Sequence, residues 1–346
     1  QRTYRDRLPI QAHMDKFDEL LQGAMKAVPE VPQEAWATVG PKSLWAPFAM
    51  TKDGDENVVD EYNPDTAYAY VEAKMQDYSQ NVANMDLVLF QQALEHVCRI
   101  ARVLANPRGN ALLVGVGGSG RQSLTRLAAY MCGMPVFQIA IKRGYGVNEF
   151  RDDVKEALLE SGCKNKPVVF LLADNQIVHE QFLEDINNIL NTGEVPNMMQ
   201  AEDYDTIIEA VRPYVKAAEK PETRGVMISH FVQLCRDNFH VVLTMSPIGE
   251  QFRRRLRMFP SLVSCTTIDW FIKWPADALE GVAMRYLSKM SIVDELKPAL
   301  AKMCVKIHQD VEENAARFYE ELRRHTYTTP TSYLELLKAY DKMYDE

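Results

Sequence analysis

Short apolar runs alternate with stripes of helical period through the middle of the chain. Each of the first four runs is followed by a segment in which apolar residues recur with the spacing of an amphipathic helix. The runs cover residues 111–114, 136–141, 168–173 and 241–245, and a fifth run, rich in Val, Thr and Ile, covers 262–268. Strands that alternate with helices predict an α/β fold with a parallel five-stranded sheet, covered by helices on both faces.

Stripes of helical period also predict the helices around this sheet. Apolar residues at positions 90, 94, 97, 101 and 104 predict a helix before the first strand, beginning near Met85 and ending at a turn over residues 106–109. Stripes within residues 147–158 and 182–190 predict two of the crossover helices that connect parallel strands.

The pattern divides the chain into a flank, a larger α/β unit and a smaller helical unit. Proline and glycine interrupt residues 1–84, where only 11–28 has a clear helical pattern, and residues 194–229 form an insertion of uncertain structure. After Trp274, helix formers continue without strand signals, with one break at residues 326–331. We therefore expect an N-terminal flank at 1–84, an α/β subdomain at 85–273, a small all-helical subdomain at 274–340 and the start of a further helix at 341–346.

Composition is that of a soluble globular protein with more than one unit. The chain has 346 residues, 47% hydrophobic and 25% charged, and this length exceeds that at which a single core keeps growing. The net charge of −9 argues against nucleic-acid binding, and no apolar stretch is long enough to span a membrane. Six scattered cysteines and a charged N-terminal stretch favour a reducing, intracellular compartment.

A glycine-rich loop, residues 115–123, joins the first predicted strand to the following helix. Its glycines let consecutive backbone N–H groups surround phosphate oxygens at a helix N-terminus. Strand, glycine loop and helix are the context that this motif requires, so we predict a site for a nucleoside di- or triphosphate; a tight turn without room for side chains is the alternative. The candidate binding residues are Gly115, Gly117, Gly118, Ser119, Gly120, Arg121, Gln122 and Ser123.

The loop departs from the standard Gly-x-x-x-x-Gly-Lys-[Ser/Thr] motif at both reactive positions. Arg121 stands where a lysine reaches the β- and γ-phosphates, and it keeps the charge without the compact geometry. Gln122 stands where a hydroxyl ligates Mg²⁺, and Ser123, one residue later, points about 100° further around the helix. We therefore expect ATP or ADP to bind with weak support for Mg²⁺.

The ends of the third and fourth strands carry the remaining candidates. Asp174 follows its strand as in a Walker B motif, and we predict that it holds Mg²⁺ together with Ser123; capping of the next helix is the alternative. Asn175 stands where hydrolases carry a glutamate base, and an amide cannot accept the proton of the attacking water. Thr244 or Ser246 is placed to sense the γ-phosphate, with a structural hydroxyl as the alternative.

The densest basic run of the chain is Arg253-Arg254-Arg255-Leu256-Arg257. Three interpretations compete: a solvated helix face, a nucleic-acid patch, or an arginine finger that reaches the nucleotide of a neighbouring subunit. The acidic balance of the chain disfavours nucleic acid and leaves the other two open. The seven histidines show no metal-ligand spacing.

Several segments together resemble the fourth AAA+ module of axonemal dynein heavy chains, over most of residues 85–340. The resemblance implies one of six unequal AAA+ modules in a ring, with a large α/β subdomain, a helical lid and a coiled-coil stalk that leads toward a microtubule-binding domain. The segments that carry it are the glycine loop through Leu124, Asn191-Thr192-Gly193-Glu194-Val195-Pro196-Asn197, Met245-Ser246-Pro247-Ile248-Gly249, Arg255-Leu256-Arg257-Met258-Phe259-Pro260-Ser261-Leu262 and Ile268-Asp269-Trp270-Phe271.

The resemblance also implies roles for individual residues. Ser246 falls at the first sensor, Arg255 matches the finger that reaches the preceding module's nucleotide, and Thr331 replaces the arginine of the second sensor. An apolar wall suits a purine ring, and core packing is the alternative for its members. The residues that would lie against the adenine are Leu87, Val88 and Phe90.

Together these features predict a regulatory, nucleotide-holding module of an axonemal dynein motor, with no catalytic residue intact. A weakly active ATPase, which would need Glu180 or Glu184 as the base, and a stand-alone P-loop ATPase are the alternatives. The implied partners are neighbouring AAA+ modules, microtubules indirectly through the stalk, and dynein intermediate and light chains elsewhere in the complex. The implied location is the cytoplasm and the cytoskeletal axoneme of a cilium.

Overall fold

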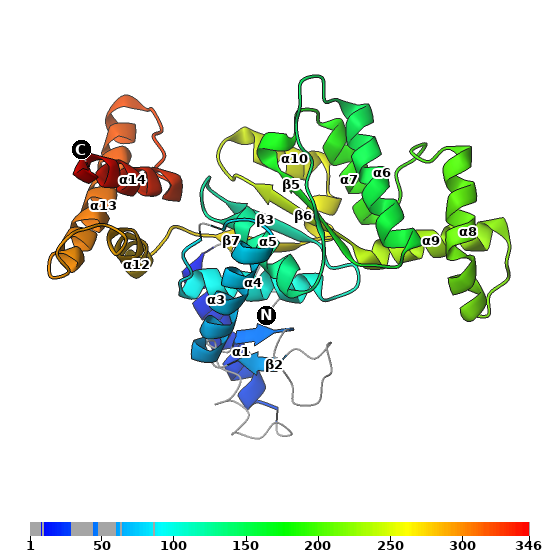
Figure 1. Ribbon diagram of the computed structural model, residues 1–346, viewed down its shortest axis with the longest axis horizontal. Helices are drawn as coiled ribbons and strands as arrows, with labels where there is room; N and C mark the ends of the chain where they lie inside the picture. Colours follow the sequence, from blue (N-terminus) through cyan, green and yellow to red (C-terminus); the bar gives the residue numbers. More distant parts are fainter. Residues whose placement is uncertain are drawn as a thin grey trace.

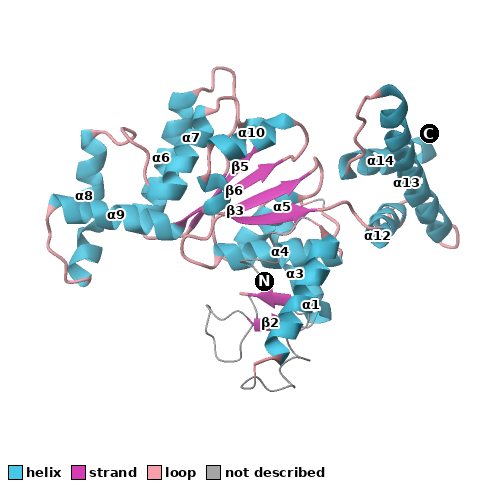
Figure 2. Cartoon of the chain, turned by 180° about the vertical axis from the view of Figure 1, so that it is seen from behind, coloured by secondary structure: helices cyan, strands magenta, loops and turns pink. Residues whose placement is uncertain are grey.

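In the computed structural model, the described residues are 8, 10–28, 44–47, 60–62, 64–85 and 87–345. Figure 1 shows a central sheet covered by helices, with a group of C-terminal helices at one end of the molecule. At the other end lie α8 (Ala201–Ala217) and α9 (Arg224–Asn238). The same arrangement is seen from behind in Figure 2.

The central sheet confirms the prediction of a parallel five-stranded sheet in an α/β fold. Its strands are β3 (Ala111–Gly115), β4 (Val136–Phe137), β5 (Val168–Ala173), β6 (Phe239–Met245) and β7 (Thr267–Phe271). They are all parallel, in the order β4-β5-β6-β3-β7. Because all five strands are parallel, the loop that follows β3 opens at the carboxyl edge of the sheet, where open α/β folds bind ligands.

Two strand predictions are wrong in their extent. The apolar run at 136–141 is a strand only in its first two residues, which form β4. The run at 262–268 begins as a short helix, α11 (Ser261–Ser264), and β7 starts only at Thr267, whose N–H donates to the Asn110 carbonyl at 2.8 Å. A short apolar run fits either a strand or a buried helix, so its hydrophobicity does not separate the two.

Alternate residues of the central strands face two separate cores. The helices on the two faces are α4 (Gln91–Leu104) with α5 (Arg121–Met131), and α6 (Val147–Cys163) with α7 (Gln181–Thr192). Leu112 of β3 packs with α6 and α7, while the adjacent Leu113 packs with α4 and α5. This is the period of two expected for a strand that is buried on both faces.

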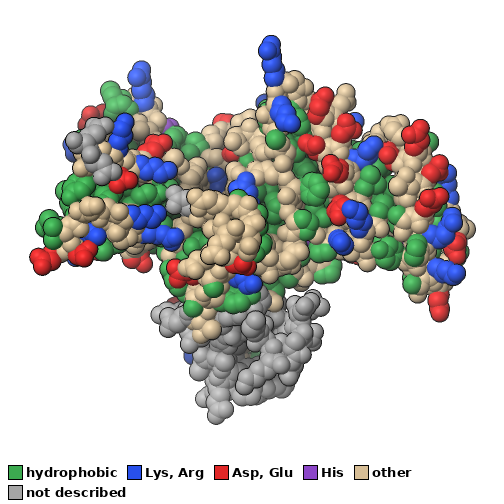
Figure 3. Space-filling model, in the orientation of Figure 1, with side chains coloured by type: hydrophobic (Ala, Val, Ile, Leu, Met, Phe, Trp, Pro, Cys, Tyr) green, Lys and Arg blue, Asp and Glu red, His purple; other side chains and the backbone are tan. Residues whose placement is uncertain are grey.

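The insertion at 194–229 is largely helical. α8 buries Ile207, Val211 and Val215, which share one face of the helix, against α6 and α9. Figure 3 shows acidic and basic side chains interspersed over this end of the molecule. Polar residues cover the solvent face of α8 and separate its apolar residues in the sequence. A search for continuous apolar runs therefore does not detect this helix.

The N-terminal flank contains one predicted helix and several elements that the sequence did not reveal. The predicted helix is α1 (Gln11–Lys26), and the further elements are β1 (Leu44–Ala46), β2 (Asp60–Tyr62) and α3 (Pro64–Asn81). β1 and β2 pair antiparallel. Asp77 of α3 accepts a hydrogen bond from the Tyr130 hydroxyl of α5 at 2.7 Å, which attaches the flank to the α/β unit.

The three helices after β7 form a lid with its own core. They are α12 (Ala276–Leu287), α13 (Lys297–Leu322) and α14 (Pro330–Asp345). Tyr333 of α14 is completely buried, and its hydroxyl donates to the Leu279 carbonyl of α12 at 2.9 Å. α14 continues through Asp345, so no break at residue 340 marks a separate element. None of the described helices is long and apolar enough to cross a membrane.

Candidate nucleotide-binding site

The loop after β3 turns sharply into α5. Gly118 and Gly120 have φ angles of +77° and +81°, in the left-handed region that is costly for residues with a side chain. The Gly120 carbonyl accepts the Leu124 N–H at 2.8 Å, so the N-terminus of α5 lies directly behind the loop. In this geometry backbone N–H groups and the positive end of the helix dipole face an anion.

The lid lies directly on this loop. A Cβ atom on Gly118 would be 1.9 Å from the Thr331 hydroxyl oxygen and 2.6 Å from its backbone nitrogen. Thr331 is the second residue of α14, and the Thr329 hydroxyl caps this helix by accepting the Ser332 N–H at 3.3 Å. Thr331 therefore contacts the phosphate loop itself.

A cavity of about 520 Å³ lies between the loop, the ends of β5 and β6, and the lid. Its volume lies within the range of small-molecule sites. The buried Ser119 hydroxyl lines it and has no hydrogen-bond partner among the described residues, so it is available to a ligand. The predicted residues that line it are Leu87, Val88, Gly117, Gly118, Ser119, Gly120, Arg121, Gln122, Ser123, Asp174, Asn175 and Thr244.

The Arg121 side chain is buried in the wall of the cavity. Its guanidinium donates to the Met245 carbonyl at 2.5 Å and to the Val116 carbonyl at 3.2 Å. Burial lowers the pKa of this guanidinium, and the Asp174 carboxylate opposes the shift. Arg121 thus joins the loop to the end of β6 through its own hydrogen bonds.

Gln122 belongs to a network of three glutamines. The Gln138 amide nitrogen donates to Gln122 Oε1 at 3.1 Å and to Gln176 Oε1 at 3.3 Å. Gln176 in turn accepts the Ala173 N–H at 2.9 Å. Arg126, which lines the cavity one turn after Gln122, donates to Gln138 Oε1. Gln122 stands at the position where a hydroxyl ligates the metal in a standard site, and its side-chain oxygen already accepts a hydrogen bond from Gln138.

The acidic end of β5 also forms bonds within the chain. Asp174 accepts the backbone N–H of Ser246 at 2.8 Å, which connects β5 to β6. Asn175 is exposed to the cavity. The Ser246 hydroxyl lies outside the cavity lining and accepts the Ile248 N–H at 3.4 Å, whereas Thr244 is buried and lines the cavity. Of the two hydroxyls considered for γ-phosphate sensing, the cavity therefore contains that of Thr244.

These residues are a poor fit for the Mg²⁺ that usually accompanies a nucleotide at a phosphate loop. Mg²⁺ requires near-octahedral oxygen ligands, generally from carboxylates, hydroxyls and phosphates. Among the described lining residues, Asp174 is the only one with a carboxylate, and Ser123 supplies a hydroxyl one position later in the sequence than the usual ligand. No group of three His, Cys, Asp or Glu that could hold a metal occurs in the described part of the chain.

The opposite half of the cavity is apolar. Leu87 and Val88 line it, and Leu87 lies near Gly120, at 3.4 Å from where a Cβ atom would be. They belong to the extended segment before α4, not to the helix, because α4 begins at Gln91 rather than near Met85. The sequence analysis missed the other lining residues of this half, which come from the lid and the segment leading to it: Trp274, Tyr286 and Leu334.

Phe90 lies behind this apolar wall and does not line the cavity. Its ring packs edge to face on Trp274, with 5.4 Å between the centroids. Trp274 belongs to the segment that leads from β7 into the lid. Phe90 therefore supports the wall. The Phe90–Trp274 pair connects the large subdomain to the segment before the lid, next to the place expected for the adenine ring.

Arg255 of α10 (Glu250–Met258) lies apart from the cavity. Its guanidinium is buried and donates to Glu180 Oε1 at 3.1 and 3.2 Å. The Glu180 Oε2 atom is also buried and has no partner among the described residues. In this conformation Arg255 is bound within its own chain. Arg253, which is exposed on the same helix, lies 3.6 Å from Glu250.

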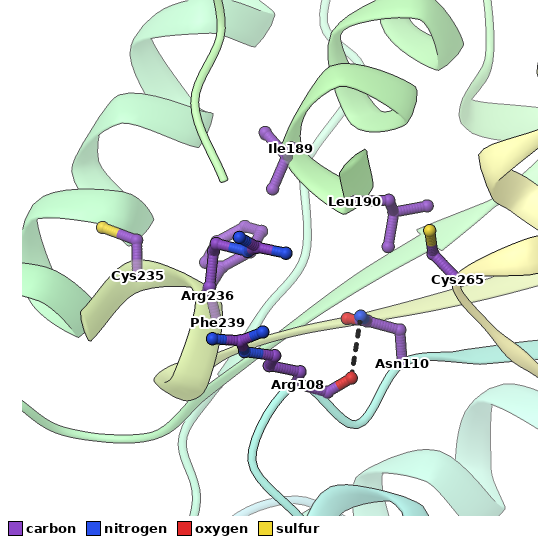
Figure 4. Close-up of a pocket in the computed structure, with 8 residues that line it drawn as sticks. All are labelled: Arg108, Asn110, Ile189, Leu190, Cys235, Arg236, Phe239 and Cys265. Carbon is purple, nitrogen blue, oxygen red and sulfur yellow. Dashed lines mark hydrogen bonds between the residues drawn. The ribbon is translucent and has the colours of Figure 1, made fainter. Parts of the chain in front are cut away.

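A second cavity, of about 210 Å³, lies at the other end of the sheet, near the start of β3 and β6. Figure 4 shows the Arg108 and Arg236 side chains on one side of it and Cys265 on the other. The Asn110 amide donates to the Arg108 carbonyl at 3.2 Å, and the Arg108 guanidinium is paired with Asp237. None of the predicted site residues lines this cavity.

The parallel sheet, the glycine loop before α5, and the helical lid that closes on this loop define a P-loop α/β module with a lid. Comparison with known proteins refines this class. A family model described as the P-loop containing dynein motor region D4 matches residues 85–343. The chain belongs to this family of dynein motor regions.

Relatives cover nearly the whole chain. It is 44% identical to "Dynein axonemal heavy chain 1" of Mus musculus over 98% of its length, and 42% identical to "Dynein beta chain, flagellar outer arm" of Chlamydomonas reinhardtii over 98%. It is 50% identical to "Dynein axonemal heavy chain 6" of Homo sapiens over 79%. The chain spans only 8% of the first two relatives and 7% of the third.

Proposed function

We propose that the chain is a regulatory AAA+ module of an axonemal dynein motor, which holds ATP or ADP with little or no hydrolysis of its own. One observation supports this most directly: the cavity has the loop and the apolar wall of a nucleotide site, while its reactive polar groups are bonded within the chain. Arg121 donates to two carbonyls, and Asp174 accepts the Ser246 N–H.

Holding and hydrolysing a nucleotide make different demands on such a site. Backbone N–H groups of the loop and an apolar wall are sufficient to hold a nucleotide. Hydrolysis also requires a base for the attacking water and charges directed at the transition state. Asn175 lines the cavity where the base would stand, and its amide does not take a proton from water.

A weakly active ATPase with Glu180 as the base is less well supported. Glu180 is bonded to the Arg255 guanidinium at 3.1 Å, so acting as a base would require this ion pair to open. The same pair constrains the proposed finger, because Arg255 would have to leave Glu180 to reach the nucleotide of a preceding module. The finger therefore requires the Arg255 side chain to leave this ion pair.

The setting of the proposed function follows from the named relatives. We infer the fourth module of a six-module ring in an axonemal dynein heavy chain, with neighbouring modules as direct partners. Microtubules would be contacted indirectly through a stalk beyond α14, and intermediate and light chains would bind elsewhere in the complex, in the cytoplasm and the ciliary axoneme. The contact of Thr331 with Gly118 offers a route from the nucleotide to α14.

Nucleotide binding and steady-state phosphate release by the purified chain test this proposal. We expect ADP to bind and ATP turnover to stay near background, since loss of a general base costs about 10² to 10⁴ in rate. Asn175→Glu should raise turnover little in the isolated chain, and Asn175→Gln serves as the matched control without a carboxylate. Robust turnover by the unmodified chain, abolished by Asp174→Ala, would contradict the proposal.

A further inference from the structure

Arg126 lies in the half of the cavity next to the glycine loop, here called the phosphate half, and no recognised motif includes this cation. Arg126 lies on α5 one helical turn after Gln122, so the two side chains share a face of the helix. This is the face from which a hydroxyl reaches the metal in a standard phosphate-loop site. Arg126 lines the same cavity as Gln122, Asp174 and the glycine loop.

The Arg126 guanidinium retains most of its donors. Its described hydrogen bond is to Gln138 Oε1, a neutral acceptor, and it forms no ion pair with another described residue. A guanidinium has five N–H donors in a planar fork, which fits two oxygens of one phosphate. Arg121 differs, because it is buried and its donors already serve the Met245 and Val116 carbonyls.

The same arrangement disfavours a divalent cation. Gln122 Oε1 is occupied by the Gln138 amide, and Gln138 Oε1 is occupied by Arg126. A metal ion bound beside Gln122 would lie next to the Arg126 charge, and two cations at such a separation repel each other in a partly buried site. The chain of bonds from Arg126 through Gln138 thus engages the side chain of Gln122, the residue at the usual metal-ligating position.

We propose that Arg126 takes the place of Mg²⁺ in this site: its guanidinium pairs with the terminal phosphate of the bound nucleotide, which is held without a metal. This inference rests on the proposed nucleotide-holding function and specifies how the phosphate charge is neutralised. The ligand that the site selects is then the free nucleoside diphosphate rather than its magnesium complex.

Calorimetric titration of the chain with ADP, in EDTA and in Mg²⁺, tests this inference. Because the site selects free ADP, we expect the wild-type chain to bind ADP at least as tightly in EDTA as in Mg²⁺, which converts the nucleotide to its magnesium complex. Arg126→Gln should weaken binding in EDTA by about 10- to 100-fold, the scale of a lost charge-assisted hydrogen bond to phosphate. Arg126→Lys should recover part of the affinity, because it restores the charge without the fork.

Arg253→Gln is the matched control, since it removes an exposed arginine of α10 outside the cavity and should leave ADP affinity unchanged. Thermal unfolding of each variant shows whether it is folded, and Arg126→Lys keeps the test valid if Arg126→Gln is not. Equal affinities of Arg126→Gln and wild type in EDTA would overturn the inference, as would a loss of several hundred-fold on chelation in the wild type. Failure of the folded wild type to bind ADP under either condition would instead refute the proposed function.

Discussion

The two halves of the cavity are constructed in opposite ways. In the phosphate half, formed by the glycine loop and the ends of β5 and β6, Arg121, Gln122 and Asp174 form hydrogen bonds to the chain itself. The bonds of Arg121 and Gln122 join the loop to β6 and to Gln138, and the bond of Asp174 joins the end of β5 to Ser246. In the opposite half, where we expect the adenine base and which we call the base half, apolar side chains come from the segment before α4 and from the lid. One half is therefore a rigid part of the sheet edge, and the other is shared between two subdomains.

This difference suggests that the phosphate half anchors the nucleotide and that the base half responds to it through the lid. Hydrogen bonds within the phosphate half hold its geometry in place before a nucleotide arrives, and they leave few groups free to follow the charge of a reacting phosphate. The base half changes whenever the lid moves, because Trp274, Tyr286 and Leu334 belong to the lid or the segment leading to it. We therefore expect nucleotide occupancy to affect the position of the lid more than the shape of the loop.

The largest effect is expected where the lid meets the loop. Gly118→Val places a branched side chain at φ +77°, and its Cβ atom would lie 1.9 Å from the Thr331 hydroxyl oxygen, so Thr331 has to move away. The backbone strain alone costs about 1 to 3 kcal/mol, and displacement of the lid adds to it, so ADP binding should weaken by about 100-fold or more. Titration with ADP measures this change.

Gly225→Ala is the control for the glycine substitution. A Cβ atom at Gly225, in α9, meets nothing within 4 Å, so this variant should keep its stability and its affinity. If Gly118→Val bound ADP as tightly as the control, the contact between lid and loop would have no part in holding the nucleotide.

Removal of the aromatic support should affect only the base half. Trp274→Ala deletes the partner of the Phe90 ring and part of the apolar wall, at a cost of about 2 kcal/mol in ADP binding. Because apolar contacts do not involve a metal, the loss should be the same in EDTA and in Mg²⁺, and Trp274→Phe should restore most of the affinity. A loss confined to Mg²⁺ would show that the two halves are not independent.

The same division explains which site residues the sequence could predict. The loop residues, Asp174 and Asn175 are local: each follows an apolar strand, and the strand fixes its place at the sheet edge. Trp274, Tyr286 and Leu334 carry no motif, because each reaches the cavity only after the lid folds back over residues far away in the chain. The partners of Arg121 are backbone carbonyls, and because every residue has one, the sequence does not show which of them Arg121 contacts.

Prediction of the fold succeeded for β3, β5 and β6, whose continuous apolar runs are those of strands buried on both faces. It failed where a short run fits two periods, as at 262–268, and where helices bury a narrow stripe beneath a charged face, as in α8. Residues 1–7, 9, 29–43, 48–59, 63, 86 and 346 lie outside the described residues, and the expectations for them stay predictions.

A moderate effect is expected at Arg121, where the phosphate half depends on its internal bonds. Arg121→Ala leaves the Met245 and Val116 carbonyls without their partner, which should lower the free energy of unfolding by about 1 to 2 kcal/mol. ADP binding should also weaken, by about 1 to 3 kcal/mol if the guanidinium assists a phosphate as the motif suggests. Denaturant unfolding and titration with ADP separate the two. Unchanged affinity together with lower stability would assign Arg121 to the wall alone.

The smallest effect concerns pH, and it should appear in the lid rather than in the loop. His308 of α13 packs edge to face on the buried Tyr333, 5.1 Å between centroids, with Glu312 at 4.0 Å. Burial lowers the pKa of His308 below 6.5; Glu312 opposes this shift and Lys273 adds to it. Because the folded pKa is the lower one, the unfolded chain binds more protons in the window between the two values.

The sign of the pH effect follows directly. The contribution of neutral His308 is complete above pH 6.5 and is lost as the pH falls through its folded pKa, so the lid should loosen on acidification. Among the described residues that line the phosphate half, none is a histidine. Amide hydrogen exchange between pH 7.5 and 5.5, corrected for the intrinsic rate, should therefore show protection lost first in α13 and α14, while β3 and α5 stay protected. His308→Gln should flatten the pH dependence of the lid and leave that of the sheet unchanged. An equal loss of protection in both regions, or a dependence that survives in His308→Gln, would show that another group titrates and that the lid does not respond independently of the loop.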